Sequence, residues 1–240
     1  MSNNILFILE GLKTEKSIID NLTKFFVNEN TIVTCAYCTT IYKMYSEISQ
    51  DQFIDTFSLL KDIKENKETL KNFKRSDFSQ IYMFFDYDGQ VTNAGDNKLS
   101  ELLKFFNEET EMGKLYISYP MVEALKHIES FDLSKSLKIP FSDFQNYKKI
   151  VSDNCIETIK HFHLYDSEIW KKVILFHLKK MNEIVHNIFE LPSLIIDQFT
   201  IFNSQLDRHI NIDKTVAILS AFPVFLLDYY GIEEIRKRLE

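Results

Sequence analysis

The sequence predicts an α/β fold, in which a mainly parallel four-stranded sheet is flanked by helices and followed by a helical C-terminal extension. In the first half, short apolar runs without polar alternation recur, as is typical of strands buried on both faces of a parallel sheet. Amphipathic segments with helical spacing separate these runs. Strand-like runs become rare later in the chain. We therefore expect an α/β domain at 1–140 and a helical region packed on it at 141–240.

Four segments have the composition of strands. Residues 5–9 (ILFIL) and 81–85 (IYMFF) are continuous apolar runs, and each stops at an acidic residue. A β-branched segment and the run KLYIS supply two more. The expected strands lie at 5–9, 31–36, 81–86 and 114–118.

Helices are expected between and after these strands, because apolar residues recur there with a helical period. Pro120 opens one of them, since proline is well tolerated in a first helical turn. The expected helices cover residues 14–26, 43–75, 97–108, 120–127, 150–164, 166–190, 194–209 and 213–229.

Composition narrows the function classes. The net charge of −7 and the pI of about 5.5 argue against a basic architectural nucleic-acid binder. They leave a nuclease open, because a bound divalent metal reverses the sign of an acidic site. Three cysteines do not form a secreted disulfide framework. With no signal peptide visible at the start and no apolar run long enough for a bilayer, we expect a cytoplasmic protein without a membrane partner.

Acidic residues follow three of the four expected strands. Glu10 follows the first, Asp86 and Asp88 end the third, and Glu123 lies just after the fourth. Sites in parallel sheets collect at the carboxyl ends of strands. Hard cations such as Mg²⁺ bind oxygen ligands of this kind. Taken singly, each acid more often caps a helix or a turn; the ordered set of four favours a metal site.

The ordered acids carry a family resemblance. The run ILFILEGLKTE, followed by MFFDYDG, resembles the Toprim fold of topoisomerases, primases and OLD-family nucleases. The segments EGLKTE at 10–15 and PMVE at 120–123 are most similar to RloB-type and PARIS-type Toprim proteins of bacterial anti-phage systems. The resemblance covers about the first 130 residues and leaves the helical remainder unassigned.

This resemblance implies a nuclease that uses Mg²⁺ or Mn²⁺. Glu10, Asp86 and Asp88 would hold one or two ions, and Glu123 would complete a second site or orient the attacking water. Glu10 is equally a candidate general base. Gly11 would let the backbone approach a phosphate, with Lys13 as a further phosphate contact. The family further implies an antiviral, abortive-infection effector in the cytoplasm, controlled by an ABC-type ATPase partner and acting on RNA, including tRNA, or on DNA.

Other motifs in the sequence give weaker indications of function. Cys35 and Cys38 form a Cys-x-x-Cys pair, but a structural zinc site needs four ligands, so buried cysteines are the favoured interpretation. His127, one turn after Glu123, is in reach of the site if that turn is helical. The sequence DYDG at 86–89 is also similar to the haloacid-dehalogenase phosphatases, although those carry it on the first strand. No P-loop, Rossmann glycine pattern or G-x-S-x-G motif occurs.

Two alternative functions remain open at this point. One is a non-catalytic Toprim-derived module that assembles with an ATPase or with a second copy, with the apolar run at 221–227 as an interface or as core. The other is a metal-dependent phosphatase or phosphotransferase using the same acids. A basic face for nucleic acid would draw on Lys171, Lys172, Lys179, Lys180, Arg236 and Lys237.

Overall fold

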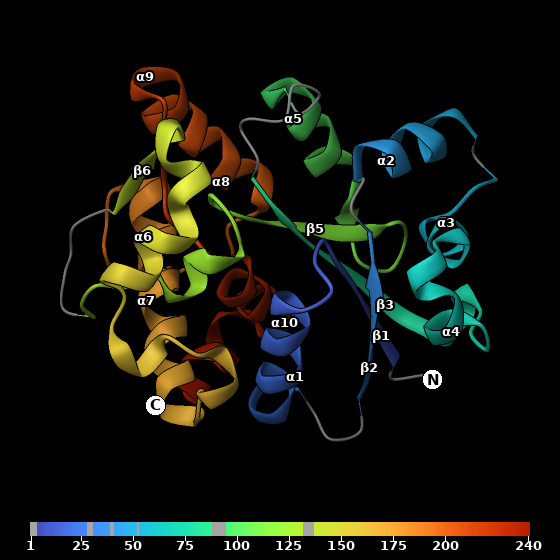
Figure 1. The fold of residues 1–240 in the computed structure, drawn as a ribbon, viewed down its shortest axis with the longest axis horizontal. Helices are drawn as coiled ribbons and strands as arrows, with labels where there is room; N and C mark the ends of the chain where they lie inside the picture. The colour runs from blue at the N-terminus through green and yellow to red at the C-terminus, as the bar shows by residue number, and fades with distance from the viewer. Residues whose placement is uncertain (1–3, 28–30, 39–40, 52, 88–94, 132–136) are drawn as a thin grey trace. The chain divides into compact units, whose positions relative to one another are not determined.

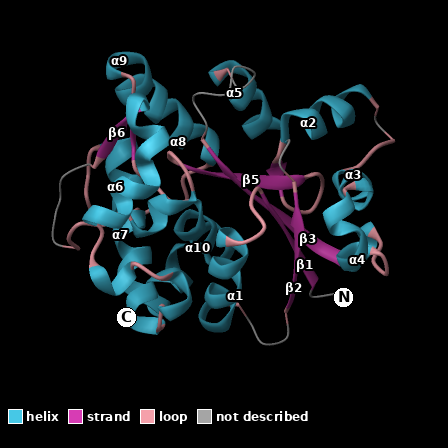
Figure 2. Cartoon of the chain, viewed as in Figure 1, coloured by secondary structure: helices cyan, strands magenta, loops and turns pink. Residues whose placement is uncertain are grey.

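A computed structural model describes residues 4–27, 31–38, 41–51, 53–87, 95–131 and 137–240 of the chain. The fold is α/β, as predicted (Figures 1 and 2). Two compact units make up the chain: residues 1–85 with 92–115 form the first, and residues 86–91 with 116–240 form the second. The expected division into domains at residue 140 stays a prediction.

The main sheet has five strands in the order β2-β1-β3-β5-β4. Strand β1 pairs in parallel with both β2 and β3, and β4 pairs antiparallel with β5. The strands are β1 Asn4–Leu9, β2 Ile32–Tyr37, β3 Phe78–Asp86, β4 Asn107–Glu108 and β5 Gly113–Ser118. The four predicted strands are therefore confirmed, while the expected count of four is wrong. Strand β4 is two exposed polar residues long, so no apolar run announces it.

The inner strands form the core of the first unit. Leu6, Phe7 and Ile8 of β1 are fully buried. The ring of Phe7 contacts Tyr82 and Phe84 of β3 edge to face, with centroids 5.9 and 5.4 Å apart. Burial on both faces explains why these strands show no polar alternation.

Helices cover both faces of β1 and β2, with α1 on one side and α3 and α4 on the other (Figure 1). The helices of this unit are α1 Thr14–Phe26, α2 Ile41–Gln50, α3 Thr56–Asp62, α4 Lys67–Leu70 and α5 Asp96–Phe105, with the 3₁₀ turns η1 Lys64–Asn66 and η2 Arg75–Asp77.

The continuous helix expected over 43–75 is wrong, because side chains interrupt it. Asp55 accepts a hydrogen bond from the Ser58 amide and starts a new helix. Buried Asn66 then pairs with both the amide and the carbonyl of Tyr37, at 2.7 and 2.9 Å. Its side chain thus satisfies the backbone at the end of β2, which a helical side chain facing solvent would not do.

The second unit is mostly helical (Figure 2). Its helices are α6 Tyr147–Asn154, α7 Ser167–His186, α8 Gln198–Gln205, α9 Asn211–Asp213 and α10 Ala221–Leu239. Its short turns are η3 Val122–Lys126, η4 Phe141–Asn146, η5 Glu157–Ile159, η6 Phe162–Leu164 and the π turn η7 Leu206–Ile210. A two-stranded antiparallel sheet joins β6 Lys138–Pro140 to β7 Thr215–Ala217.

Three expected helices of this unit need correction. Residues 120–127 form a 3₁₀ turn rather than an α-helix. The segment 150–164 ends as α-helix at Asn154 and continues as two 3₁₀ turns. The helix expected from residue 213 starts at Ala221, because 215–217 is a strand that pairs with β6.

The apolar run at 221–227 lies in the core of this unit. Ala221, Phe225 and Leu226 are fully buried, and α10 packs against α7. This burial supports the core interpretation of the run over the interface interpretation. Across the residues that the structure describes, no helix is both long enough and apolar enough to cross a membrane.

Candidate functional site

The first candidate acid, Glu10, directly follows β1. Its amide donates a hydrogen bond to the carbonyl of Phe84, at 3.3 Å. Asp86 ends β3 two residues beyond Phe84, and β1 and β3 are parallel neighbours in the sheet. The two residues thus follow adjacent strands, as the prediction requires. Glu10 belongs to the first compact unit and Asp86 to the second, so the convergence of their carboxylates stays a prediction.

The close approach of the Glu15 side chain explains why position 11 is a glycine. A Cβ atom built on Gly11 would lie 2.6 Å from Oε1 and 2.8 Å from Cδ of Glu15. Real Cβ atoms do not approach so closely, so any other residue at position 11 would displace the carboxylate. Glu15 is buried, in the first turn of α1, where the helix dipole favours a negative charge. The glycine therefore makes room for a buried carboxylate, a role that the sequence did not indicate.

Lys13 occupies the N-cap position of α1 and is exposed. Its side chain makes no capping hydrogen bond. A small cavity of about 160 Å³ lies nearby, lined in part by Gly11, Leu12 and Lys16. Helix N-termini with lysines beside them suit phosphate groups. The predicted phosphate contacts are compatible with this arrangement and stay predictions.

In the second unit, Asp86 and Glu123 both act electrostatically on one buried tyrosine. Both carboxylates act on the hydroxyl of Tyr147, which is fully buried in the first turn of α6. Burial raises the pKa of Tyr147 well above its usual value, and the negative charges of Glu123 and then Asp86 raise it further. The phenol therefore keeps its proton. Two of the predicted acids thus lie within electrostatic reach of the same hydroxyl.

Glu123 is only partly satisfied in its buried position. Its side chain lies in η3 and is 8% exposed. Oε1 is 3.5 Å from the Lys148 ammonium, which belongs to a side chain that is 74% exposed. Oε2 is buried and has no hydrogen-bond partner among the described residues. An unsatisfied buried acceptor costs about 1–3 kcal/mol. A water or a divalent cation would satisfy this oxygen, and the role of Glu123 as a metal ligand stays a prediction.

A tyrosine–histidine pair lies behind the two acids. Nδ1 of His127 is 3.0 Å from the Tyr147 hydroxyl. Burial and, to a smaller extent, the nearby charge of Lys180 together lower the pKa of His127 to about 4. The imidazole is therefore neutral, and its Nδ1 shares one hydrogen bond with the protonated phenol. This bond fixes the orientation of the hydroxyl that faces Asp86 and Glu123.

His177 anchors the backbone around Glu123. It is completely buried, and both ring nitrogens are used: Nε2 donates to the Leu125 carbonyl at 3.1 Å, and Nδ1 accepts from the Ser220 amide at 3.3 Å. The first bond holds η3, which carries Glu123, against α7. Its role is structural, as is usual for a lone buried histidine.

Sequence reasoning missed Tyr147 and Lys148. Both follow the segment that resembles Toprim proteins, and no local pattern distinguishes them from other helix-start residues. Their link to the acids is a long-range contact. His127 was a candidate on the assumption of a helical turn, and the structure places it behind Tyr147 instead. Asp88 lies outside the described residues.

The predicted metal site stays a prediction. No cluster of three or more His, Cys, Asp or Glu side chains suited to a metal ion occurs there. Asp86 and Glu123 supply two candidate ligand groups in the second unit. Mg²⁺ keeps several waters when one or two carboxylates bind it, so two such groups are a sufficient core for a site.

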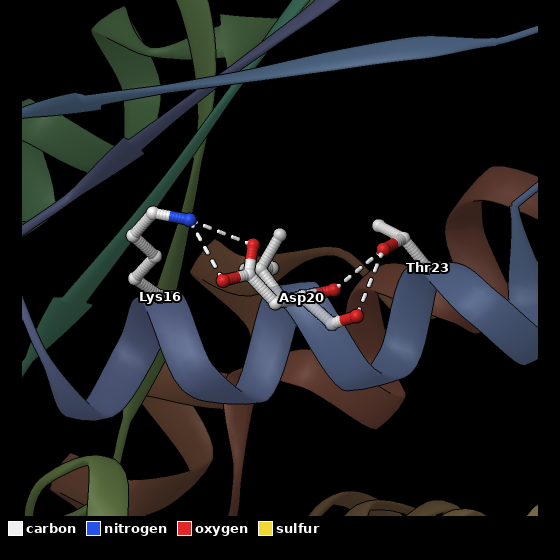
Figure 3. A network of polar contacts seen from close by, with 4 residues as sticks. Lys16, Asp20 and Thr23 are labelled. Atoms are coloured by element: carbon white, nitrogen blue, oxygen red, sulfur yellow. Dashed lines mark hydrogen bonds and ion pairs between the residues drawn. The ribbon is translucent and has the colours of Figure 1, made fainter. Parts of the chain in front are cut away.

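The Cys-x-x-Cys pair lies beside the ion pair of α1. Lys16 contacts both carboxylate oxygens of Asp20, at 2.8 and 2.7 Å (Figure 3). Burial raises the pKa of the Cys35 thiol to about 11, and Lys16 opposes this only in part. A thiol with this pKa is a poor nucleophile and a poor metal ligand at neutral pH. Cys38 is buried, and Cys35 is a free thiol.

Comparisons of the chain with protein-family models, with curated proteins and with solved structures give no match. The resemblance to Toprim proteins therefore rests on the motifs alone.

Proposed function

We propose that the protein is a nuclease that uses Mg²⁺ or Mn²⁺ to hydrolyse phosphodiester bonds. The observation that carries this proposal is the buried Glu123, with one carboxylate oxygen unpaired among the described residues, whose charge reaches the same Tyr147 hydroxyl as that of Asp86 at the end of β3. A cation bound to this oxygen would satisfy it. The position at the carboxyl ends of strands is where α/β proteins bind their ligands.

In this proposal Glu10, Asp86, Asp88 and Glu123 hold the metal. When bound, the ion would polarise the phosphodiester and stabilise the leaving oxygen. The exposed Lys13 and the first-turn amides of α1 would bind a non-bridging phosphate oxygen.

One acid would remove a proton from the attacking water as its oxygen bonds to phosphorus. Glu10 and Glu123 are both candidates for this base. Tyr147, held by His127, would position the water by accepting or donating a hydrogen bond while keeping its own proton.

The resemblance extends the proposal to biology. We propose an effector of bacterial anti-phage defence, active in the cytoplasm and controlled by an ABC-type ATPase. The substrate is RNA, including tRNA, or DNA. The basic face available to it is smaller than the sequence suggested, because Lys180 is buried, with 1% of its side chain exposed. An acidic protein with few clustered cations binds long nucleic acids weakly on its own, which favours a compact substrate or help from a partner.

An activity assay on the purified full chain tests the proposal. Labelled tRNA, plasmid DNA and small phosphomonoesters would be incubated with Mn²⁺, with Mg²⁺ and with a chelator. We expect metal-dependent cleavage of a nucleic acid. Cleavage of phosphomonoesters alone would instead identify a phosphatase. If the protein forms a complex with the ATPase but cleaves neither nucleic acids nor phosphomonoesters, it is a non-catalytic module.

The matched variants are Asp86→Ala and Asp153→Ala, since Asp153 is an exposed acid of the same unit that pairs with Lys149. Asp86→Ala should abolish cleavage and leave the melting temperature unchanged or raised, because removing one acid relieves repulsion between carboxylates. Asp153→Ala should keep full activity. A fully active Asp86→Ala variant, or one that is inactive because it unfolds, would refute the assignment.

A further inference from the structure

A second cavity, separate from the acids described above, lies in the second unit. Its volume is about 460 Å³, within the range of small-molecule sites. The end of α7, the π turn η7 and strand β6 line it. Its charged lining residues are Lys138, Glu183, Asp207 and Arg208, and its lining also includes Asn187, His209 and Ile212.

The π turn directs His209 into this cavity. Residues 206–210 interrupt the helical segment between α8 and α9, and π turns of this kind occur frequently at functional sites. The turn is anchored at its start by Gln205, whose fully buried amide exchanges two hydrogen bonds with the backbone of Ala217, at 2.7 and 2.9 Å. His209 is consequently held with only 8% of its surface exposed.

Two polar atoms of the cavity are buried and unsatisfied. Nδ1 of His209 and Oε2 of Glu183 have no hydrogen-bond partner within the described ranges. Oε2 is 4.0 Å from the Lys180 ammonium, which donates instead to the Leu137 carbonyl at 3.1 Å. Buried polar groups are normally hydrogen-bonded. A ligand or a water can therefore bind here, with Nδ1 of His209 as donor or acceptor and Oε2 of Glu183 as acceptor.

Cationic groups stand beside these atoms. Arg208 donates through Nη1 to the Ile184 carbonyl and to Asn187 Oδ1, at 2.9 and 2.7 Å. In the described residues no hydrogen bond uses its Nη2. Lys138 is 3.7 Å from Asp213, and both side chains are partly exposed, so this ion pair is easily exchanged. Lys180, which does not line the cavity, is buried, and burial lowers its pKa to about 7.

We infer that this cavity binds a small organic phosphate that carries a hydroxyl-bearing sugar, with nucleoside monophosphates as the ligand class. Lys138, Arg208 and the Nδ1–H tautomer of His209 would donate to the phosphate oxygens. Oε2 of Glu183 would accept a hydrogen bond from a sugar hydroxyl. Ile212, whose side chain is largely exposed at the rim, would contact the base. The site is independent of the proposed nuclease centre.

Calorimetric titration of the full chain tests the inference. The probes are the four ribonucleoside monophosphates, ribose 5-phosphate, inorganic phosphate and adenosine, all with chelator present so that no metal site contributes. We expect saturable one-to-one binding of at least one monophosphate, and binding of adenosine weaker by about tenfold or more, since it lacks the phosphate. No saturable binding at millimolar concentration would overturn the site. Inorganic phosphate binding as tightly as every nucleotide would overturn the ligand class.

Variants separate this cavity from others. Lys138→Gln and Glu183→Gln should each weaken binding several-fold, while Lys149→Gln, an exposed lysine of the same unit, should leave it unchanged. Arg208→Gln should weaken binding most, by about tenfold or more, since charged hydrogen bonds are the strong ones. Arg208 also donates hydrogen bonds to the end of α7, so the melting curve of Arg208→Gln must show that the variant is folded. Lys138→Gln removes neither of these bonds. Binding that Lys138→Gln and Glu183→Gln leave unchanged would refute the inference, whereas binding retained in Asp86→Ala would support it.

Discussion

Two buried glutamates follow strands of the sheet, one in the first turn of α1 and one in η3, and they differ in how their carboxylate oxygens are satisfied. Glu15 in the turn after β1 and Glu123 in the turn after β5 are 7% and 6% exposed. Glu15 folds its carboxylate over Gly11, in space that the missing side chain leaves, at the start of a helix. Glu123 has one oxygen near an exposed lysine and the other without a hydrogen-bond partner in the described part of the chain.

The comparison separates burial from function. A buried carboxylate at a helix N-terminus interacts favourably with the helix dipole and needs no ligand. A buried carboxylate with an unsatisfied oxygen carries a free-energy cost until a cation or a water binds to that oxygen. We therefore assign Glu15 to the fold and propose Glu123 for the chemistry, although the motifs placed both in one family pattern.

The largest expected effect contrasts these two residues directly. Glu123→Gln should lower the rate of metal-dependent cleavage by roughly 10²- to 10⁴-fold, the range for losing a positioned acid or base. Glu15→Gln should change the rate by less than about threefold and lower the free energy of unfolding by about 0.3–1 kcal/mol, the usual size of a helix-dipole interaction. Rates measured at saturating Mn²⁺, alongside melting curves, check both. Equal loss of rate in the two variants would break the comparison.

Low pH should destabilise the unit that contains Glu123, because its buried histidines His127 and His177 resist protonation, and should have less effect on the turn that contains Glu15. All six histidines of the chain follow residue 126. Burial lowers the pKa of His127 and of His177 to about 4. Above pH 6.5 both are neutral whether the chain is folded or unfolded. Between pH 6.5 and about 4 the unfolded chain binds protons that the folded chain does not.

Stability should therefore fall as the pH decreases through this window, by about 1.4 kcal/mol for each of these histidines per pH unit. Urea unfolding at pH 7 and pH 5 measures the change. The control is His127→Gln, because glutamine can accept the Tyr147 hydrogen bond but does not titrate. It should be less stable at pH 7 and show a smaller loss at pH 5. An unchanged loss would show that His127 is not neutral in the folded protein.

Gly11→Ala tests the turn around Glu15. The added methyl group would collide with the Glu15 carboxylate, so we expect a loss of about 1–3 kcal/mol, typical of overpacking. In the background of Glu15→Ala the same change should cost much less, because the collision partner is gone. A double-mutant cycle from denaturant unfolding gives this coupling energy. Additive losses would show that Gly11 is needed for another reason.

The sequence predicted the strands better than the helices, for a physical reason. Strands β1, β3 and β5 are apolar on both faces, so their composition alone locates them. The interruptions of the expected helix at 43–75 depend on Asp55 and Asn66, whose side chains bond to distant or local backbone. Strands β6 and β7 are three residues long and exist because they pair with each other across a separation of about 75 residues. No local pattern carries that information.

The candidate site was foreseen in part. Acids after strands were predicted from residue type and order, and the structure places Asp86 and Glu123 near one phenol. The phenol and its histidine partner come from segments 20 residues apart in sequence, and a turn rather than a helix carries Glu123. An unsatisfied oxygen is a property of packing, so it becomes visible only once the chain is folded.

The smallest expected effect concerns Lys148, the lysine that pairs with Glu123. Its side chain is 74% exposed and its ammonium is 3.5 Å from Oε1, so Lys148→Gln should change stability by no more than about 1 kcal/mol. Because the ammonium competes with a metal ion for the same carboxylate, its loss should lower the Mn²⁺ concentration needed for half-maximal cleavage by a few-fold. Added salt should shrink this difference, since an exposed charge is screened. Lys149→Gln, which removes an exposed pair with Asp153 on α6, is the matched control. A Lys148→Gln variant that needs more Mn²⁺ than the unmodified protein would mean that the lysine binds substrate. The Lys148 ammonium, rather than a metal ion, would then be the cation that neutralises Glu123.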